Sequence, residues 1–276
     1  MRRTFLLLPG SWSGAWIWEP VVRRLRLLGH DARAVTLRGL SGPRDDVAGV
    51  GLQTHVDEVL TLLKNEGLRD VVLVGHSYSG LVAGQVADRA PGRVAHTVYV
   101  EAFLPHDGRS MLHAFPDRQR EQELRLIETG GGRWPAPDHT LVAEGQGLTA
   151  AQARWLAARF VGHPGRAVAE AAVLSTPLER QRASYVVCDL DHFQGSLSPD
   201  VSALRAAPSW DFHTLDTGCW PMVSAPGPLS ALLSDAVARP PRPPRAPPRA
   251  GGPRPRRRPP HPPPPPHPPP KNQHPR

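Results

Sequence analysis

The most constraining feature of this sequence is a short apolar run that leads directly into a turn of small residues with a serine at its centre. Residues 71–74 are Val-Val-Leu-Val, which is typical of a buried parallel strand, and the turn Gly-His-Ser-Tyr-Ser follows at residues 75–79. Residues 81–89 have the apolar spacing of a helix. A serine between a strand and a closely packed helix is the pattern of a nucleophile elbow, which exposes the serine hydroxyl at the carboxyl edge of a sheet. Ser77 is therefore the candidate nucleophile.

The residues on either side of Ser77 agree with this interpretation. A strand and a helix approach closely in an elbow only if the residues two before and two after the serine are small. Gly75 and Ser79 occupy these positions, so a serine replaces the second glycine of the usual pattern. The alternative is an ordinary strand end whose serine caps the next helix.

The carboxyl-terminal residues have a composition of their own. Of the 34 prolines, 19 lie at or after Arg239, together with ten Lys or Arg and no acidic residue. We predict a disordered tail at residues 239–276, with a polyproline ligand as the alternative, because such a segment buries too little apolar surface to fold. Without these ten cations the net charge of +8 becomes about −2. The folded part is therefore not expected to bind nucleic acid.

Strand-like and helix-like patterns alternate along the rest of the chain. We predict strands at residues 4–8, 32–37, 71–74, 94–100, 183–188 and 210–215, and helices at 15–28, 52–66, 81–89, 199–206 and 227–237. This alternation predicts one α/β domain at residues 1–238 with a doubly wound, mostly parallel sheet. The rhythm stops at about residues 105–180, where prolines and glycines separate helical patches at 150–161 and 167–174. We interpret this stretch as a helical cap inserted between two strands.

Acyl transfer by a serine also requires backbone donors for the oxyanion. The loop Pro-Gly-Ser-Trp-Ser-Gly at residues 9–14 follows the first predicted strand and should lie at the same sheet edge as Ser77. The backbone N–H groups of Ser11 and Tyr78 are the candidate donors. A plain glycine turn is the alternative for this loop.

The reaction needs an acid and a base as well. Asp189 and Asp191 follow the strand predicted at residues 183–188; we choose Asp191 as the acid and keep Glu101, at another strand end, in reserve. A solvated loop carboxylate is the alternative for Asp191. The base is expected in the loop after the last strand, which reads Asp-Thr-Gly-Cys-Trp-Pro-Met at residues 216–222 and contains no histidine. His213 falls inside the strand pattern and is expected on a strand face.

Three segments together resemble the α/β-hydrolase superfamily, in particular its methyl esterases, hydroxynitrile lyases and their bacterial relatives. They are Pro-Gly-Ser-Trp-Ser-Gly-Ala-Trp at 9–16, Gly-His-Ser-Tyr at 75–78 and the segment 216–222. The resemblance implies a carboxylesterase-type serine hydrolase that acts on a small or aromatic ester, with no metal or cofactor. In this branch the acid precedes the histidine by 28 residues, which is the interval from Asp191 to Cys219. The resemblance therefore implies a triad of Ser77, Asp191 and Cys219.

A cysteine is a poor replacement for the histidine of this family. An imidazole titrates near about 6.5 and has two nitrogens, one for the acid and one for the serine, whereas a thiol titrates near about 8.5 and is a weak hydrogen-bond partner. A neighbouring carboxylate raises the thiol pKa further. Three explanations stay open: His192, His106 or another histidine supplies the base; the protein binds or tailors a hydrophobic metabolite without triad hydrolysis; or Cys219 is a sequence error or a recent loss.

Other aromatic and small residues bear on the substrate. The resemblance disfavours cyanohydrin cleavage, because Trp220 stands where the lyases have a lysine and Gly10 where they have a threonine. Trp12, Trp16, Trp18 and Trp220 suggest an aromatic pocket, with core packing as the alternative.

The sequence also gives an expectation for the setting of the protein. The apolar run at residues 5–8 is too short for a signal sequence or a membrane span, so we expect a cytoplasmic protein without a membrane partner. Cys188 and Cys219 are then expected to be free thiols. A homodimer stays open.

Overall fold

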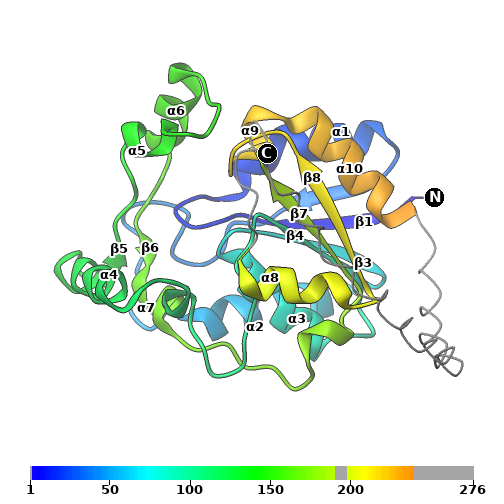
Figure 1. Cartoon of the computed structure of the whole chain (residues 1–276), viewed down its shortest axis with the longest axis horizontal. Coiled ribbons are helices and arrows are strands. Elements are labelled where there is room, and N and C mark those ends of the chain that lie inside the picture. The colour runs from blue at the N-terminus through cyan, green and yellow to red at the C-terminus, as the bar shows by residue number, and fades with distance from the viewer. Residues whose placement is uncertain (1, 190–197, 239–276) are drawn as a thin grey trace, which may run out of the picture. The chain divides into compact units, whose positions relative to one another are not determined.

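The computed structural model describes residues 2–189 and 198–238, and its centre is a six-stranded sheet (Figure 1). The strands are β1 (Thr4–Leu8), β2 (Asp31–Ala34), β3 (Val71–His76), β4 (Val94–Val100), β7 (Ala183–Cys188) and β8 (Trp210–Leu215). They lie in the order β2-β1-β3-β4-β7-β8, and every neighbouring pair is parallel. The predicted doubly wound α/β class is confirmed.

Helices cover both faces of this sheet. Along β1, Phe5 and Leu7 belong to one buried core and Leu6 and Leu8 to the other, because successive strand residues point to opposite faces. The first core also contains α1 (Glu19–Leu27) and α10 (Pro226–Ala238), and the second contains α2 (Leu52–Asn65) and α3 (Ser79–Arg89). Every residue of β3 is buried, which explains why the strand is a continuous apolar run.

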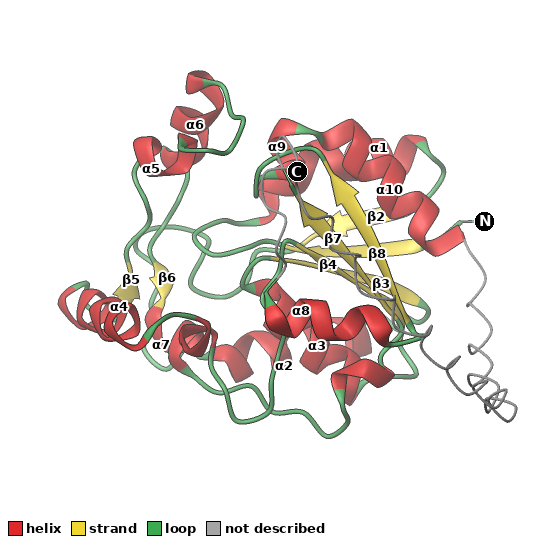
Figure 2. Ribbon diagram, in the orientation of Figure 1, coloured by secondary structure: helices red, strands yellow, loops and turns green. Residues whose placement is uncertain are grey.

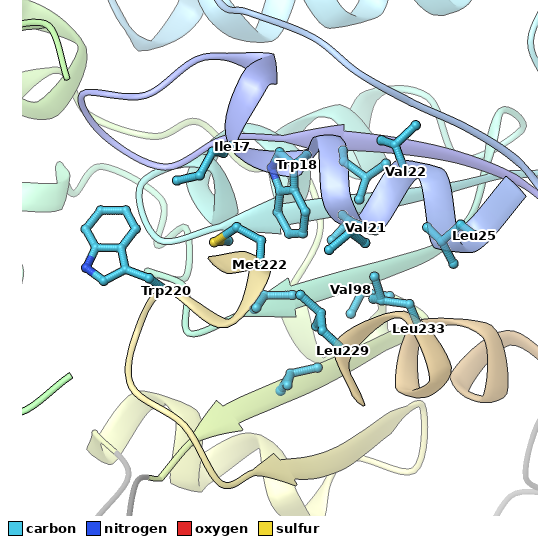
Figure 3. Packing of buried hydrophobic residues seen from close by; sticks show 14 of the residues in the cluster. Ile17, Trp18, Val21, Val22, Leu25, Val98, Trp220, Met222, Leu229 and Leu233 are labelled. Carbon is cyan, nitrogen blue, oxygen red and sulfur yellow. The ribbon is translucent and has the colours of Figure 1, made fainter. Parts of the chain in front are cut away.

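Figure 3 shows the first core from close by. Leu229 and Leu233 of α10 lie over Val98 of β4, and Trp18 and Trp220 belong to the same buried cluster. Core packing, the alternative that the sequence left open for the tryptophans, therefore holds for these two.

The order of the strands makes a topological switch point between β1 and β3. These two strands are neighbours, but the chain continues from β1 to β2 on one side and from β3 to β4 on the other. The loops that leave the carboxyl ends of β1 and β3 therefore diverge, and ligands of open α/β sheets bind at such a switch point. Ser77 follows β3 and Ser11 follows β1, so the topology brings the two predicted loops to one place.

A long inserted segment, residues 101–182, joins β4 to β7. Its elements are η2 (Met111–Ala114), α4 (Asp117–Thr129), β5 (Arg133–Trp134), α5 (His139–Ala143), α6 (Ala150–Ala157), β6 (His163–Pro164), α7 (Gly165–Ala169) and η3 (Leu178–Arg180). β5 and β6 pair as a short antiparallel ribbon, and Figure 2 shows α5 and α6 beyond it, away from the central sheet.

Short helices complete the described chain. They are η1 (Ala15–Trp18), α8 (Pro199–Ala203), η5 (Leu204–Ala206) and α9 (Pro221–Ser224). In the part of the chain that the structure describes, no helix is long and apolar enough to cross a membrane.

Three predicted elements were too long. The helical patch predicted at 150–161 is one of them, since α6 ends at Ala157. The strand predicted at 32–37 ends at Ala34, because Thr36 turns away and its Oγ1 accepts a hydrogen bond from the backbone N–H of Ala15 at 2.8 Å. The helix predicted at 167–174 ends at Ala169, because the next residues run extended and the N–H of Val173 donates to Oε1 of Gln85 at 2.9 Å. Side chains distant in sequence decided the ends of the last two.

We predict that Gly80→Ala destabilises the fold although alanine favours a helix. A Cβ on Gly80 would overlap the carbonyl oxygen of Phe103, which is backbone and cannot move aside. Overpacking of this kind costs about 1–3 kcal/mol, measured as a lower midpoint of urea unfolding. The matched control is Gly92→Ala, because a Cβ there meets nothing within 4 Å. Equal midpoints for the two variants would contradict the close approach.

Candidate active site

Ser77 occupies a strained turn between β3 and α3. Its φ angle is +48°, in the left-handed region that L-residues other than glycine rarely adopt. The turn is held from both sides, since the N–H of Ser77 donates to the carbonyl of Val100 at 3.2 Å and its own carbonyl accepts from Phe103 at 3.1 Å. The side chain stays half-buried rather than enclosed. This geometry agrees with an elbow and not with an ordinary strand end.

Small residues make the turn compact. A Cβ on Gly75 would lie 2.5 Å from the carbonyl oxygen of Ser79, so β3 and α3 do approach closely there. The hydroxyl of Ser79 donates to the carbonyl of Pro9. Ser79 thus ties the elbow to the loop after β1, which the usual glycine could not do.

The loop after β1 lies against Ser77. A Cβ on Gly10 would be 3.0 Å from Cβ of Ser77 and 2.6 Å from Nδ1 of His76, so the threonine of the lyases would not fit here without movement. Ser11 is buried, and its neighbour Trp12 has a φ angle of +63°. Within residues 2–189 and 198–238, no acceptor is found for the backbone N–H of Ser11 or of Tyr78. Their role as oxyanion donors stays a prediction.

The inserted segment holds this loop in place. The N–H of Val161 donates to the carbonyl of Trp12 at 2.9 Å, and the N–H of Trp12 donates to Nδ1 of His163 at 3.4 Å. The rings of Trp12 and Trp134 lie 4.4 Å apart between centroids. Burial keeps the pKa of His163 well below its usual value, so the ring is neutral and Nδ1 is free to accept.

The Tyr78 side chain is anchored away from solvent. Its hydroxyl donates to Nδ1 of His55 at 2.8 Å, and Nε2 of His55 donates to the carbonyl of Arg38 at 2.9 Å. Burial lowers the pKa of His55 to about 4 and raises that of Tyr78 well above 10. Both groups are therefore neutral at physiological pH, and they fix the position of the Tyr78 backbone.

The loop after β8 brings Cys219 to the same place. Nε2 of His76, the residue before Ser77, donates to the carbonyl of Cys219 at 2.7 Å. The N–H of Cys219 donates to Oε1 of Gln146 in the inserted segment at 2.6 Å. Burial and then the charge of Glu101 raise the pKa of the Cys219 thiol to about 12. At neutral pH this group is a protonated thiol and cannot take a proton from Ser77.

The predicted acid and the alternative histidine bases do not all lie within the described residues. Asp191 and His192 lie outside the described residues, so their places are not known from the structure. Nε2 of His106 lies 3.1 Å from Oδ2 of Asp200, and His213 lies within β8 opposite Val186, as expected of a strand-face residue.

The reserve acid, Glu101, is a mostly buried carboxyl directly after β4. Its Oε2 accepts a hydrogen bond from the N–H of Cys188 at 2.7 Å. Burial raises its pKa above the usual value, and the neighbouring Asp189 adds to this effect. Cys188 and Cys219 are both free thiols, as expected.

A cavity of about 550 Å³ opens beside Glu101. Its apolar wall comes from Leu81, Phe103 and Met111, among others, and Tyr185 and Cys188 lie on the β7 side. A cavity of this size suits a small organic molecule.

Several residues that position the site were not found from the sequence. His76, Gln146 and His163 each bond a catalytic loop, but each contact joins residues far apart in the chain. Of these three residues only His76 could have been found from the sequence, because it lies inside the elbow motif.

We predict that neither cysteine reacts quickly with iodoacetamide in the folded protein at pH 8. With a pKa of about 12, Cys219 is thiolate in roughly one molecule in 10⁴, and the pKa of Cys188 lies higher still. The labelling rate should therefore be about 10³-fold below that of the chain in urea. It should rise about tenfold per pH unit toward pH 10, because the thiolate fraction grows as the pH approaches the pKa. Rapid labelling of Cys219 at pH 8, located by mass spectrometry, would contradict the raised pKa.

Comparisons with known proteins agree with this geometry. The chain is 40% identical over 114 residues to a carbendazim hydrolyzing esterase of Nocardioides, covering 41% of this chain and 47% of that protein. It is 33% identical over 107 residues to methylesterase 8 of Arabidopsis thaliana, covering 38% and 39%. The matched region thus spans less than half the length of these curated relatives.

Solved structures share the fold over most of the chain. An extracellular alpha/beta-hydrolase from a Paenibacillus species, described as sharing homology with tobacco salicylic acid binding protein 2, superposes with a TM-score of 0.74 at 23% identity, covering 85% of this chain and 98% of that one. Tomato methylketone synthase I, solved with 2-tridecanone, superposes with a TM-score of 0.67 at 14% identity, covering 86% and 98%. The sequence pattern of the alpha/beta hydrolase family matches residues 5–232, and the chain belongs to this family.

Proposed function

We propose that this protein is a serine hydrolase that cleaves a small-molecule ester through an acyl-enzyme on Ser77. The observation that carries the proposal is the positive φ angle of Ser77, held by Val100 and Phe103 at the switch point of the sheet. The names of the curated relatives, a carbendazim hydrolyzing esterase and several methylesterases, support the ester class.

In this reaction the Ser77 hydroxyl attacks the ester carbonyl. The backbone N–H groups of Ser11 and Tyr78 then donate hydrogen bonds to the negatively charged carbonyl oxygen of the ester. A site gains most from donors that need no reorganisation during the reaction. Ser11 lies in a loop held by Ser79 and by the inserted segment, and Tyr78 is anchored by His55. Preorganised donors of this kind contribute about 10² to 10³ each in kcat.

Position 219 limits this chemistry. A thiol with a pKa of about 12 is ionised in about one molecule in 10⁵ at pH 7, so Cys219 in the base position supports little turnover. Loss of a triad base costs about 10⁴ to 10⁶ in kcat, and the oxyanion donors and binding still supply about 10³ over water. Asp191 remains our proposed acid from its spacing to Cys219.

The substrate class follows from the aromatic residues at the loop after β1. Trp12 and Trp16 are half-buried, and both rings lie about 6 Å from that of Phe160 in the inserted segment. This cluster favours a flat or aromatic ester. Trp18 and Trp220 contribute to the core instead, and none of the four tryptophans lines the cavity beside Glu101.

A second function is favoured by one observation, the protonated thiol of Cys219. A relative whose base is lost keeps its oxyanion donors and its pocket, and such a protein binds a hydrophobic metabolite without hydrolysing it. The two functions differ in whether the wild-type chain shows turnover that depends on Ser77.

We predict that Cys219→His raises kcat/KM for an aryl acetate and an aromatic methyl ester by about 10² to 10⁴, because an imidazole can exchange protons near pH 7. The wild type should show a weak activity that disappears in Ser77→Ala. The control is the double variant Ser77→Ala, Cys219→His, which should lose the whole gain. Hydrolysis that persists without Ser77 would refute the acyl-enzyme. A silent wild type with an active Cys219→His variant would favour the binding function.

A further inference from the structure

Glu101 is placed beside Ser77 by the backbone. Its neighbours in sequence hold the elbow, since Val100 accepts from the N–H of Ser77 and Phe103 donates to its carbonyl. Glu101 itself has a φ angle of +41°, a conformation that is costly for a residue with a side chain. Strained residues of this kind gather at functional sites. Of the four non-glycine residues with a positive φ angle in the described chain, Ser77 and Glu101 directly follow the neighbouring strands β3 and β4, Trp12 lies in the loop after β1, and Asp70 precedes β3.

Among residues 2–189 and 198–238, the carboxylate of Glu101 has fewer partners than a buried charge usually has. Within the described residues it accepts a single hydrogen bond, from the N–H of Cys188, and no Lys, Arg or His forms an ion pair with it. A carboxylate offers about four acceptor sites on two oxygens, so Glu101 retains most of its capacity. It also lines the cavity of about 550 Å³, which gives water and ligands access.

Three buried histidines hold the loops of the site. His76 is next to Ser77, but its Nε2 donates to the carbonyl of Cys219 and the ring is fully buried. His55 and His163 anchor Tyr78 and Trp12. Burial lowers the pKa of all three rings, so a carboxylate at the cavity is an alternative kind of base.

We propose that Glu101 is the general base for Ser77 in this chain. This inference rests on the proposed ester hydrolysis. The proton of the Ser77 hydroxyl passes to the Glu101 carboxylate, directly or through one water molecule, while Oγ forms its bond to the ester carbon. When the intermediate collapses, the bond to the alcohol breaks and the leaving oxygen takes this proton. In the second half Glu101 accepts a proton from water, the hydroxyl attacks the acyl group, and the proton returns to Oγ of Ser77.

The surroundings of Glu101 raise its pKa. Burial disfavours its charged form, and Asp189 at the end of β7 acts in the same direction. The groups that face it are Cys188 and Tyr185 of β7, Cys219 of the loop after β8, and, around the cavity, His106, Arg109, His113 and Asp200. A carboxyl with a raised pKa is a stronger base than a solvated one once it has ionised.

The test is the part of aryl acetate hydrolysis that Ser77→Ala abolishes, measured in the full-length protein from pH 4 to pH 11. The wild-type kcat/KM should rise with pH through one inflection above 4.5, the ordinary glutamate value, and then reach a plateau. Glu101→Gln should lower the plateau by about 10² to 10⁴. Glu128→Gln, an exposed glutamate in α4, is the matched control and should leave the rate unchanged.

A second variant separates chemistry from folding. Glu101→Ala should be inactive alone and should regain activity with added formate, which can enter the cavity and replace the carboxylate. Urea midpoints and circular dichroism of both variants show whether they fold. If they do not fold, the pH profile of the wild-type protein tests the proposal by itself. A rate that climbs tenfold per pH unit up to pH 11, or a Glu101→Gln protein within threefold of wild type, overturns the proposal. Equal rates for wild type and Ser77→Ala would instead overturn the ester hydrolase function itself.

Discussion

The close packing around the Ser77 turn is the constraint on which the rest of the site depends. Gly75 lets α3 approach β3, Gly80 lets the backbone near Phe103 lie against α3, and Gly10 lets the loop after β1 reach Ser77. At each of these places the missing Cβ would meet atoms within about 3 Å. The strain of the turn persists because several neighbours over-determine it. The loop after β1, the end of β4 and the loop that contains Cys219 are all positioned relative to this turn.

Burial favours the neutral forms of the titratable side chains in the site. His55, His76 and His163 are all enclosed, and burial lowers the pKa of each far enough that the ring is neutral. They act as hydrogen-bonding links between loops and not as proton carriers. Thiol and carboxyl groups respond in the opposite direction, because burial favours their neutral acid forms and raises the pKa of Cys219 and of Glu101.

The sequence predicted the features whose causes are local. Strands buried on both faces are continuous apolar runs, so β3, β4 and β7 could be placed, and the elbow has a motif because its strain demands specific small residues. Cys219 does lie in the loop after β8, but its place in the triad stays a prediction from the resemblance. Contacts across the chain left no local signal: Thr36 ends β2, and Gln146 and His163 hold catalytic loops from within the inserted segment. Asp191 and the tail remain predictions, because they lie outside the described residues.

The inserted segment contacts the loops after β1 and β8 through a small set of residues. Val161 uses its main chain, and Trp134, Gln146, Phe160 and His163 use side chains. By contrast, α4 contains no buried residue. Most residues of this segment can therefore change during evolution without disturbing the site, provided that these contacts are kept. A segment transplanted from a relative would need to reproduce the same contacts. Its remaining surface could differ and so favour a different substrate.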